Sequence, residues 1–204
     1  MKIYLSPSDQ WSNKTVTGTT EAEQCGKIAR AVAMVLNKRG NITLVGDNSV
    51  EKSYRKRVVE SNKFGSDLHI CIHTNAGGGK GTLVLCSDKS KDNKYVKSIY
   101  ESVAKLTPSD DNGILVRSDL YEINATKAVC VYIEVEFHDN LETQKWIESN
   151  IDNIALAISD GITPATSSVI YKVQVGAFKD KQNAISMQSK LKELGYEAII
   201  KEER

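Results

Sequence analysis

The feature that most constrains the fold of this chain is an almost unbroken apolar segment from Val129 to Phe137. Its β-branched and aromatic side chains are typical of β-strands. A segment that is apolar at nearly every position predicts a central strand of a sheet covered on both faces. Two acids interrupt the segment, Glu134 and Glu136. Burying an acid in such a strand costs free energy, so Glu134 is a candidate catalytic residue.

A second apolar segment, residues 68–73, also ends in polar side chains: His73 is followed by Thr74 and Asn75. Ligands of open α/β sheets usually bind at the carboxyl ends of the strands. If both segments are parallel strands, their polar ends face one site. The sequence therefore predicts that His73 and Glu134 lie near each other.

Strand-like and helix-like patterns alternate along roughly the first 160 residues, which predicts βα units. We predict an α/β fold, with a mostly parallel twisted sheet, helices on both faces and a small βαβ-like C-terminal tail. The expected strands are 2–5, 42–45, 68–73, 82–86, 114–116, 120–123 and 129–134. The expected helices are 20–39, capped by Thr20 and stopped by Gly40, 50–64, 95–106 and 142–160.

The composition of the sequence changes after Gly161. A short Pro/Ser/Thr-rich stretch, residues 163–168, predicts a linker between domains. Beyond it, residues 169–178 and 197–200 read as strands, and residues 183–194 read as a helix. The predicted domains are thus 1–162 and 169–204.

Composition excludes some classes of protein. The 204 residues include 27 basic and 26 acidic side chains, so the chain lacks the basic excess of a nucleic-acid-binding protein. It also lacks the run of about 18 apolar residues that a membrane-spanning helix requires. Its N-terminus reads as a strand rather than a secretory signal, so we expect a soluble protein made in the cytoplasm.

Four cysteines lie far apart in the sequence and form no Cys-x-x-Cys pair of the kind seen in structural zinc and redox sites. We expect Cys71 and Cys130 to be reduced residues of the core. His69 precedes His73 by four residues of one strand, about 13 Å at roughly 3.3 Å per residue, so the two histidines cannot share one metal ion. We expect His69 to be a hydrogen-bonded core residue.

The residue types favour a catalytic zinc site. Such a site requires about three ligands from His, Glu, Asp or Cys and an open position for water. His73 is suited to be a ligand, and a separate carboxylate such as Glu134 is suited to move the proton. Glu21, at the predicted start of the first helix, is a further candidate ligand, although an acid there also interacts favourably with the helix dipole.

Three motifs, in the right order, resemble the zinc-dependent N-acetylmuramoyl-L-alanine amidases of bacterial cell-wall turnover, spore-mother-cell lysis and phage endolysins. Glu21 stands seven residues before an Ile-Ala pair. His73 begins His-Thr-Asn-Ala, and Glu134 begins Glu-Val-Glu-Phe-His-Asp-Asn. The resemblance covers the chain from Met1 to about Ile162.

The resemblance implies that Glu21 and His73 bind Zn²⁺, that Glu134 is the catalytic acid and base, and that Asn75 contacts the substrate. It implies hydrolysis of the amide between N-acetylmuramic acid and the first L-alanine of the stem peptide in peptidoglycan. It also implies that the enzyme acts on the cell wall after release from the cytoplasm.

The chain departs from the family pattern at the first histidine ligand. The first strand ends in Leu-Ser-Pro-Ser-Asp-Gln, so Asp9 stands where the family has histidine. Aspartate is a legitimate zinc ligand. His138, just after the second segment, is an alternative that could reach the same edge, and we prefer it over Asp9.

Residues 171–178 and the segment up to Gly195 resemble the first half of a sporulation-related (SPOR) repeat, which binds glycan strands stripped of stem peptides. The second half of the repeat is missing, and an unpaired strand there leaves homodimer formation open. Two competing functions also stay open: a metal-free peptidoglycan-binding pseudoenzyme, and an unrelated α/β metal hydrolase acting on a small amide.

Overall fold

The computed structural model describes residues 1–50, 53–109, 111–164 and 174–202. The chain divides into two compact units, Met1–Ala165 and Thr166–Arg204. The predicted linker, residues 163–168, lies mostly outside the described residues. The two units are described separately below.

One six-stranded sheet forms the centre of the first unit, in the order β2-β1-β3-β6-β4-β5. Neighbouring strands are parallel except for β4 and β6, which are antiparallel. The strands are β1 (Lys2–Pro7), β2 (Ile42–Val45), β3 (Leu68–Asn75), β4 (Leu83–Cys86), β5 (Gly113–Val116) and β6 (Val129–Phe137). The predicted α/β fold with a mostly parallel sheet is confirmed.

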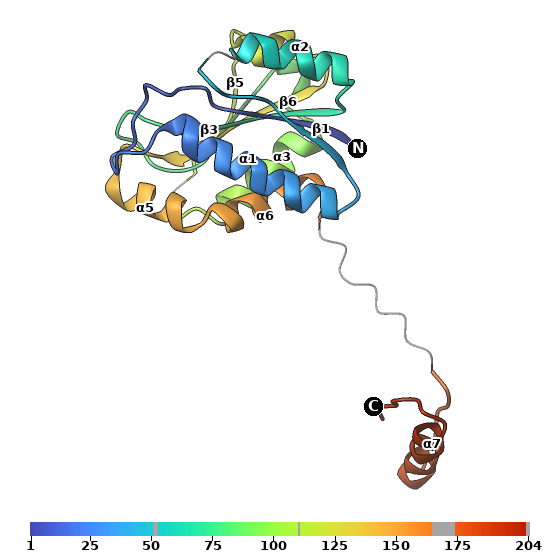
Figure 1. The fold of residues 1–204 in the computed structure, drawn as a ribbon. Helices are drawn as coiled ribbons and strands as arrows, with labels where there is room; N and C mark the ends of the chain where they lie inside the picture. Colours follow the sequence, from blue (N-terminus) through green and yellow to red (C-terminus); the bar gives the residue numbers. More distant parts are fainter. Residues whose placement is uncertain (51–52, 110, 165–173, 203–204) are drawn as a thin grey trace. The chain divides into compact units, whose positions relative to one another are not determined.

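Helices cover both faces of this sheet (Figure 1). The helices α1 (Glu21–Lys38), α3 (Lys94–Ala104) and α6 (Ile151–Ile162) pack together on one side, and α2 (Tyr54–Phe64) lies on the other with α4 (Tyr121–Ala125). The helix α5 (Leu141–Ser149) follows β6, and a 3₁₀ turn, η1 (Asp88–Ser90), follows β4. The unit is thus a three-layer α/β/α arrangement.

The two faces of the sheet differ in chemistry because side chains alternate along a strand. On the face covered by α1, α3 and α6, fully buried aliphatic residues such as Ile70, Ile72 and Ile133 form the main core. The opposite face of β3 carries His69, Cys71 and His73, all buried. The face under α2 and α4 therefore combines buried polar side chains with a small apolar cluster that includes Ile123 and Leu85.

The first helix begins where its sequence predicts. The Thr20 side chain accepts a hydrogen bond from the Glu23 backbone N–H (3.2 Å), so Thr20 is the N-cap and Glu21 is the first helical residue. At the other end Gly40 has a φ of 78°, which glycine adopts without strain. The start of α1 is fixed at the carboxyl edge of the sheet by this cap.

Two element predictions for the first unit are wrong. Residues 120–123 are not a strand: Tyr121–Ala125 form the short helix α4, whose Ile123 is buried beside Cys71 and Cys130. The predicted helix 142–160 is two helices, because the chain breaks at Asn150, whose side chain donates to the Trp146 carbonyl (2.9 Å). Asparagine favours such local bonds over a continuing helix.

In the second unit the predicted helix 183–194 is present as α7 (Lys181–Glu193), with Asp180 as its N-cap. The predicted strand 169–178 lies outside the described residues up to position 173, and residues 174–178 have no regular structure. Residues 197–200 are likewise not a strand. A strand needs hydrogen-bonded neighbours, and none pairs with these segments in the described part of the unit.

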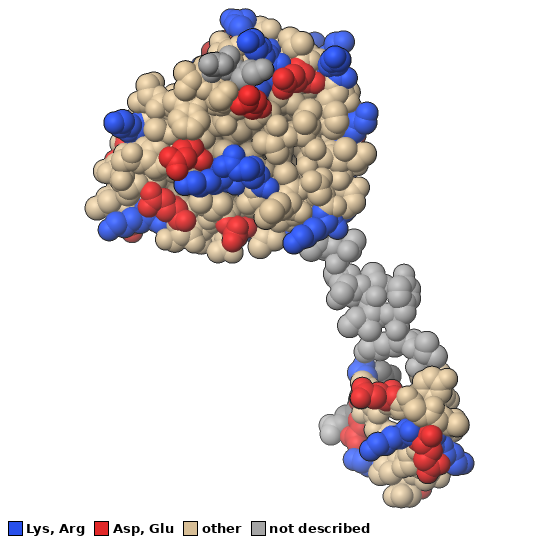
Figure 2. Space-filling model, in the orientation of Figure 1, with Lys and Arg blue, Asp and Glu red and all other residues tan. Residues whose placement is uncertain are grey.

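No described helix is long and apolar enough to cross a membrane. On the face of the first unit seen in Figure 2, acidic and basic side chains alternate in small groups, and no large patch of one sign is present there. This pattern agrees with the nearly balanced charge of the whole chain.

Candidate active site

Strands β3 and β6 bring His73 and Glu134 together. They are neighbouring parallel strands, and His73 pairs directly with Glu134 in their register. The register then shifts: Asn75 pairs with Phe137, so β6 carries one more residue than β3 in this interval. Such bulges are common beside active sites, where they redirect side chains. The predicted proximity of His73 and Glu134 is confirmed.

The bulge gives Glu136 a role that the sequence left open. Its side chain is fully buried, and Oε1 accepts hydrogen bonds from the backbone N–H groups of Gly81 (2.6 Å) and Phe137 (3.0 Å). Glu136 therefore anchors the loop before β4.

Helix α1 supplies the third group of the cluster. Glu21 is 1% exposed, and its Oε1 lies 2.8 Å from Nδ1 of His73. Asn13 donates to Glu21 Oε2 (2.7 Å), and Gln10 donates more weakly to Oε1 (3.4 Å). The loop between β1 and α1 thus orients the carboxylate toward His73.

These groups shift each other's protonation. Burial by itself disfavours the charged form of His73 and raises the pKa of Glu21, but their hydrogen bond reverses both effects: the pKa of His73 is raised and that of Glu21 is lowered. Burial raises the pKa of Glu134 to about 7, His73 opposes this rise and Glu21 adds to it. Glu134 can therefore exchange a proton near neutral pH.

Two buried polar atoms of the site have no hydrogen-bond partner among the described residues: Nε2 of His73 and Oε2 of Glu134. The His73 ring stacks on Tyr132, with ring centroids 4.3 Å apart. Buried polar groups are nearly always paired in folded proteins. Unpaired polar atoms on adjacent strands indicate a site built to take up a ligand.

His138, one of the two alternatives for a further ligand, is fully buried and reaches this cluster through Asn13. Its Nε2 lies 3.3 Å from the Asn13 side-chain oxygen, and its Nδ1 lies 2.9 Å from Thr74 Oγ1. An amide oxygen only accepts, so Nε2 carries the proton in this arrangement. Asn13 therefore connects His138 to Glu21.

Asp9, the other alternative, binds elsewhere. Its Oδ2 accepts from the Tyr54 backbone N–H (3.0 Å) and forms an ion pair with Arg57 Nη1 (3.3 Å). Both partners belong to α2. The Asp9 carboxylate is thus engaged by α2, whereas His138 shares a partner with Glu21.

The donors at this edge suit zinc in their chemistry: imidazole nitrogen and carboxylate oxygen, two of them already in contact, beside an unpaired Glu134 oxygen. The structure does not bring the donor atoms of all three proposed ligands together. Among the described residues, Glu21, His73 and His138 do not bring their donor atoms within 4.8 Å of one another, whereas His69, Cys71 and Cys130 do.

A glycine loop, residues 77–81, borders the site. Asp139 Oδ2 accepts from the backbone N–H groups of Gly77 (2.6 Å) and Gly78 (2.8 Å). Asn75, half-buried at the end of β3, accepts from the Ala76 N–H through its side chain and from the His138 N–H through its carbonyl. Asn75 therefore joins β3 to the segment that follows β6.

Comparison with known proteins identifies the first unit. Residues 9–164 match the family described as N-acetylmuramoyl-L-alanine amidase. The chain belongs to this amidase family. Residues 167–204 match the SPOR domain, so the resemblance of both segments is confirmed.

Curated relatives and solved structures agree with the match. N-acetylmuramoyl-L-alanine amidase CwlM of Bacillus licheniformis is 24% identical over 214 residues, which cover 98% of this chain and 84% of the relative. The sporulation-specific N-acetylmuramoyl-L-alanine amidase of Bacillus subtilis (strain 168) is 24% identical over 215 residues, with the same coverage.

In the amidase AmiC2 of Nostoc punctiforme the fold is the same. The superposition has a TM-score of 0.72 and covers 79% of this chain and 94% of that one, at 14% sequence identity. This comparison shows that the amidase unit and AmiC2 share a fold.

The sequence analysis missed the residues that orient the amidase site. Asn13 and Thr74 connect His138 to its surroundings, and Tyr132 stacks on His73. Tyr132 could have been found, because it precedes Glu134 by two residues on the same face of a strand. Asn13 lies in an irregular loop, for which the sequence carries no periodic signal.

Proposed function

We propose that the amidase unit hydrolyses the amide bond between N-acetylmuramic acid and L-alanine in peptidoglycan, with Glu134 as the proton carrier. The observation that carries this proposal is the direct pairing of His73 and Glu134 on adjacent strands, with Glu21 in contact with His73. The Glu134 carboxylate is close to the other two groups and has an unpaired oxygen. The proposal rests on this geometry together with the family membership.

In the proposed reaction Glu134 takes a proton from the attacking water and later gives it to the leaving nitrogen of L-alanine. A carbon–oxygen bond forms at the lactyl carbonyl and the carbon–nitrogen bond breaks, leaving a carboxylate and a free amine. Glu21, His73 and one further residue would hold the zinc ion, which would supply Lewis acidity at the carbonyl and at the attacking water.

We assign the further ligand to His138 rather than Asp9. The support is positional: His138 reaches Glu21 through Asn13, whereas Asp9 is paired with Arg57. We therefore expect His138→Ala to lose most bound zinc and Asp9→Ala to retain it, as measured by elemental analysis after dialysis. Circular dichroism of both variants controls for folding. The reverse pattern, with zinc lost only in Asp9→Ala, would overturn the assignment.

We also propose that Asn75 contacts the substrate. It ends β3 two residues after His73, at the rim of the site, and it is only partly buried. Replacement by alanine should raise KM more than it lowers kcat, because binding rather than proton transfer is affected.

Product analysis tests the proposed reaction. Purified peptidoglycan treated with the whole chain should release fragments with new L-alanine amino termini, detected by mass spectrometry after amino-terminal labelling. Protein with Glu134→Gln serves as the matched control, since it retains the fold but not the proton carrier. New reducing sugar ends, or cleavage within the stem peptide, would contradict the proposed bond.

The SPOR segment is proposed to retain the enzyme on the wall. We assign residues 1–162 to catalysis, 163–168 to a linker and 169–204 to peptidoglycan binding, supported by the SPOR match. Sedimentation with peptidoglycan that has been stripped of stem peptides should bring down the whole chain but not a chain ending at Ala165. Equal sedimentation of both would assign wall binding to the amidase unit.

Two finer proposals concern assembly and location. We propose a homodimer through the second unit, with the exposed apolar side chains Leu194, Tyr196 and Ile199 as the contact to be tested. Sedimentation equilibrium of the whole chain would then give twice the mass expected for one chain, and a monomer at all concentrations would exclude the homodimer.

We further propose that the enzyme acts on the wall after release from the cytoplasm, which cell fractionation tests.

A metal-free wall-binding protein is the competing function. The family match and the amidase names of the curated relatives favour the enzyme. An unrelated hydrolase of small amides is excluded by the family membership.

A further inference from the structure

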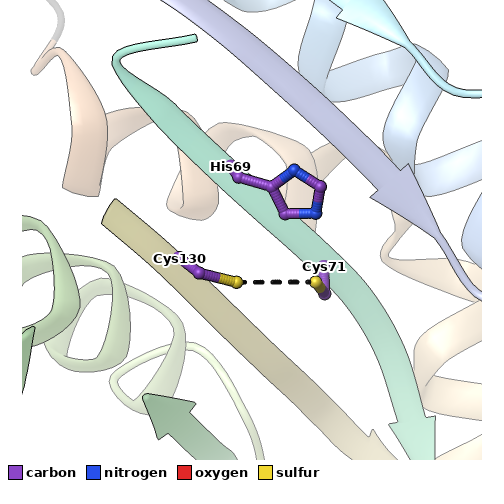
Figure 3. Close-up of side chains that lie close together, drawn as sticks. All are labelled: His69, Cys71 and Cys130. Atoms are coloured by element: carbon purple, nitrogen blue, oxygen red, sulfur yellow. Dashed lines mark hydrogen bonds between the residues drawn. The ribbon is translucent and has the colours of Figure 1, made fainter. Parts of the chain in front are cut away.

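We propose that His69, Cys71 and Cys130 form a second metal site, for a thiophilic divalent cation such as Zn²⁺, on the face of the sheet that α4 covers (Figure 3). This site is separate from the amidase site, and only the total of two ions per chain expected in its test rests on the proposed amidase metal. His69 and His73 are four residues apart on one strand, so one ion cannot bind both.

The fold brings the three side chains together through strand geometry. His69 and Cys71 are two residues apart on β3 and lie on the same face. Cys130, on β6, pairs with His69 in the register of the two strands. Their ligand atoms all lie within 4.8 Å of one another, and all three residues are buried. Figure 3 shows the two sulfurs facing each other across the gap between the strands, with the His69 ring over β3 near Cys71.

The spacing of the sulfurs suits a shared metal ion. The Sγ atoms of Cys71 and Cys130 are 3.8 Å apart. With zinc–sulfur bonds of roughly 2.3 Å in a tetrahedral site, two thiolates on one ion lie about 3.8 Å apart. A disulfide requires a sulfur–sulfur distance of about 2.05 Å. The observed sulfur–sulfur distance therefore matches two thiolates on one metal ion, and in the metal-free protein it corresponds to a hydrogen bond between the two thiols.

The surroundings of the His69 imidazole also favour a metal site. The side chain is fully buried, and neither ring nitrogen has a hydrogen-bond partner among the described residues. The ring is held by stacking on Tyr4, with centroids 5.2 Å apart and planes 7° apart. An imidazole that is fixed in orientation, and whose nearest polar contact is the 3.5 Å approach of Nε2 to Glu122 Oε1, is suited to donate to a metal ion.

Nearby charges suit a bound cation. Glu122 Oε1 lies 3.5 Å from His69 Nε2, where it can be a fourth ligand or can accept a proton from the imidazole. Ser6 donates to the same carboxylate oxygen and accepts from Nε of the buried Arg57 (2.8 Å). Two thiolates and the Glu122 carboxylate would carry three negative charges, which a divalent ion and the Arg57 guanidinium, shared with Asp9, would largely offset.

Cobalt substitution of the whole chain tests the proposal. Co²⁺ bound by thiolates absorbs in the near ultraviolet through sulfur-to-metal charge transfer, whereas the oxygen and nitrogen ligands of the amidase site give no such band. Protein refolded with Co²⁺ should show the band and contain two metal ions per chain. Cys71→Ser and Cys130→Ser should each lose the band and one of the two ions.

Cys86→Ser is the matched control, because Cys86 is a buried free cysteine of the neighbouring strand β4 outside the cluster. It should keep the band and both ions. If wild-type protein shows no thiolate band while all four cysteines react as thiols in denaturant, the site binds no metal. If two thiols are missing in denaturant without reductant, the pair forms a disulfide, which also overturns the proposal.

The sulfur-specific band also separates this proposal from the amidase assignment. Loss of the band with hydrolysis retained would refute only the second site. A band with no hydrolysis would refute only the amidase mechanism.

Discussion

Glu134 shows how one carboxylate set into a central strand can serve a reaction near neutral pH. Its pKa of about 7 results mainly from burial in β6; His73 lowers it and Glu21 raises it. Proton exchange is most efficient when the carrier's pKa is close to the working pH. The same burial that makes an acid costly in a strand thus makes it useful for proton transfer.

Replacing Glu134 by glutamine should remove proton transfer and leave the rest of the site in place. We expect kcat to fall roughly 10²–10⁴-fold, the range typical of a lost general acid–base group. Bound zinc should stay at the wild-type level, since Glu21 and His73 are untouched. Rates of peptidoglycan hydrolysis and elemental analysis measure the two effects. Loss of zinc together with activity would make Glu134 a ligand instead.

Asp139 makes the glycine loop sensitive to acid. Partial burial raises its pKa, but hydrogen bonds from Gly77 and Gly78 outweigh this effect, so the pKa is lowered on folding. A carboxylate with a lower pKa in the folded state stabilises the fold above its unfolded pKa of about 3.9. That contribution is lost as pH falls through the folded pKa.

Asp139→Asn should therefore be less stable than wild type at pH 7, by about 1 kcal/mol at most because the side chain is largely exposed. The difference in free energy of unfolding should shrink as the pH falls below about 4. Urea denaturation of both proteins across this range measures it. A difference that does not change with pH would show that the carboxylate charge plays no part.

At the scale of elements, the contact between α3 and α6 depends on one glycine. A Cβ atom at Gly161 would lie 2.5 Å from the Ile99 Cα and 2.8 Å from the Ser98 carbonyl oxygen, both backbone atoms. Backbone atoms cannot rotate out of the way as the end of a side chain can. The close approach of these two helices therefore requires the absence of a side chain at position 161.

Gly161→Ala should lower the free energy of unfolding by about 1–3 kcal/mol, as overpacking does elsewhere. Helix propensity alone would make the alanine variant more stable, by about 1 kcal/mol. A loss of stability would therefore report the packing clash. Gly26→Ala in α1 is the control, because the atoms nearest to a Cβ there belong to the side chains of Arg30 and Asn48, at 3.3–3.6 Å. Thermal unfolding should separate the two; equal stability would contradict the packing argument.

Strand and helix periodicity predicted most elements of the sheet and its two covering layers. It failed for residues 120–123, because a short apolar segment reads equally as a strand or as one turn of a buried helix. It also failed at Asn150, where a single side-chain bond divides a continuous helical pattern. In both cases a local contact outweighed the pattern.

Parts of the site were predictable for a related reason. His73 and Glu134 each follow from the pattern of their own strand, and their pairing follows from the shared edge of a parallel sheet. The cluster of Cys71 and Cys130 was not predictable, because it depends on the register between two strands 59 residues apart in the chain. Sequence alone does not give that register.

At the scale of the whole molecule, stability resides in the first unit. Its core contains all the buried apolar residues of the two hydrophobic clusters, from Ile3 to Ile162. In the second unit α7 has no buried residue. The first unit therefore has the apolar core that a separately folding domain requires.

A chain ending at Ala165 should unfold cooperatively at the temperature of the whole chain, within about 2 °C. Differential scanning calorimetry of both proteins, with the same metal content, measures this. A large drop in the unfolding temperature would show that the second unit stabilises the amidase unit through contacts.

The order of the strands has a consequence for synthesis. Strand β6 is the last strand of the sheet to be made, yet it lies in the middle, between β3 and β4. Until Phe137 has left the ribosome, both neighbours present unpaired backbone edges, which are templates for association between chains. The strand that carries Glu134 into the candidate active site is thus also the one that closes the sheet.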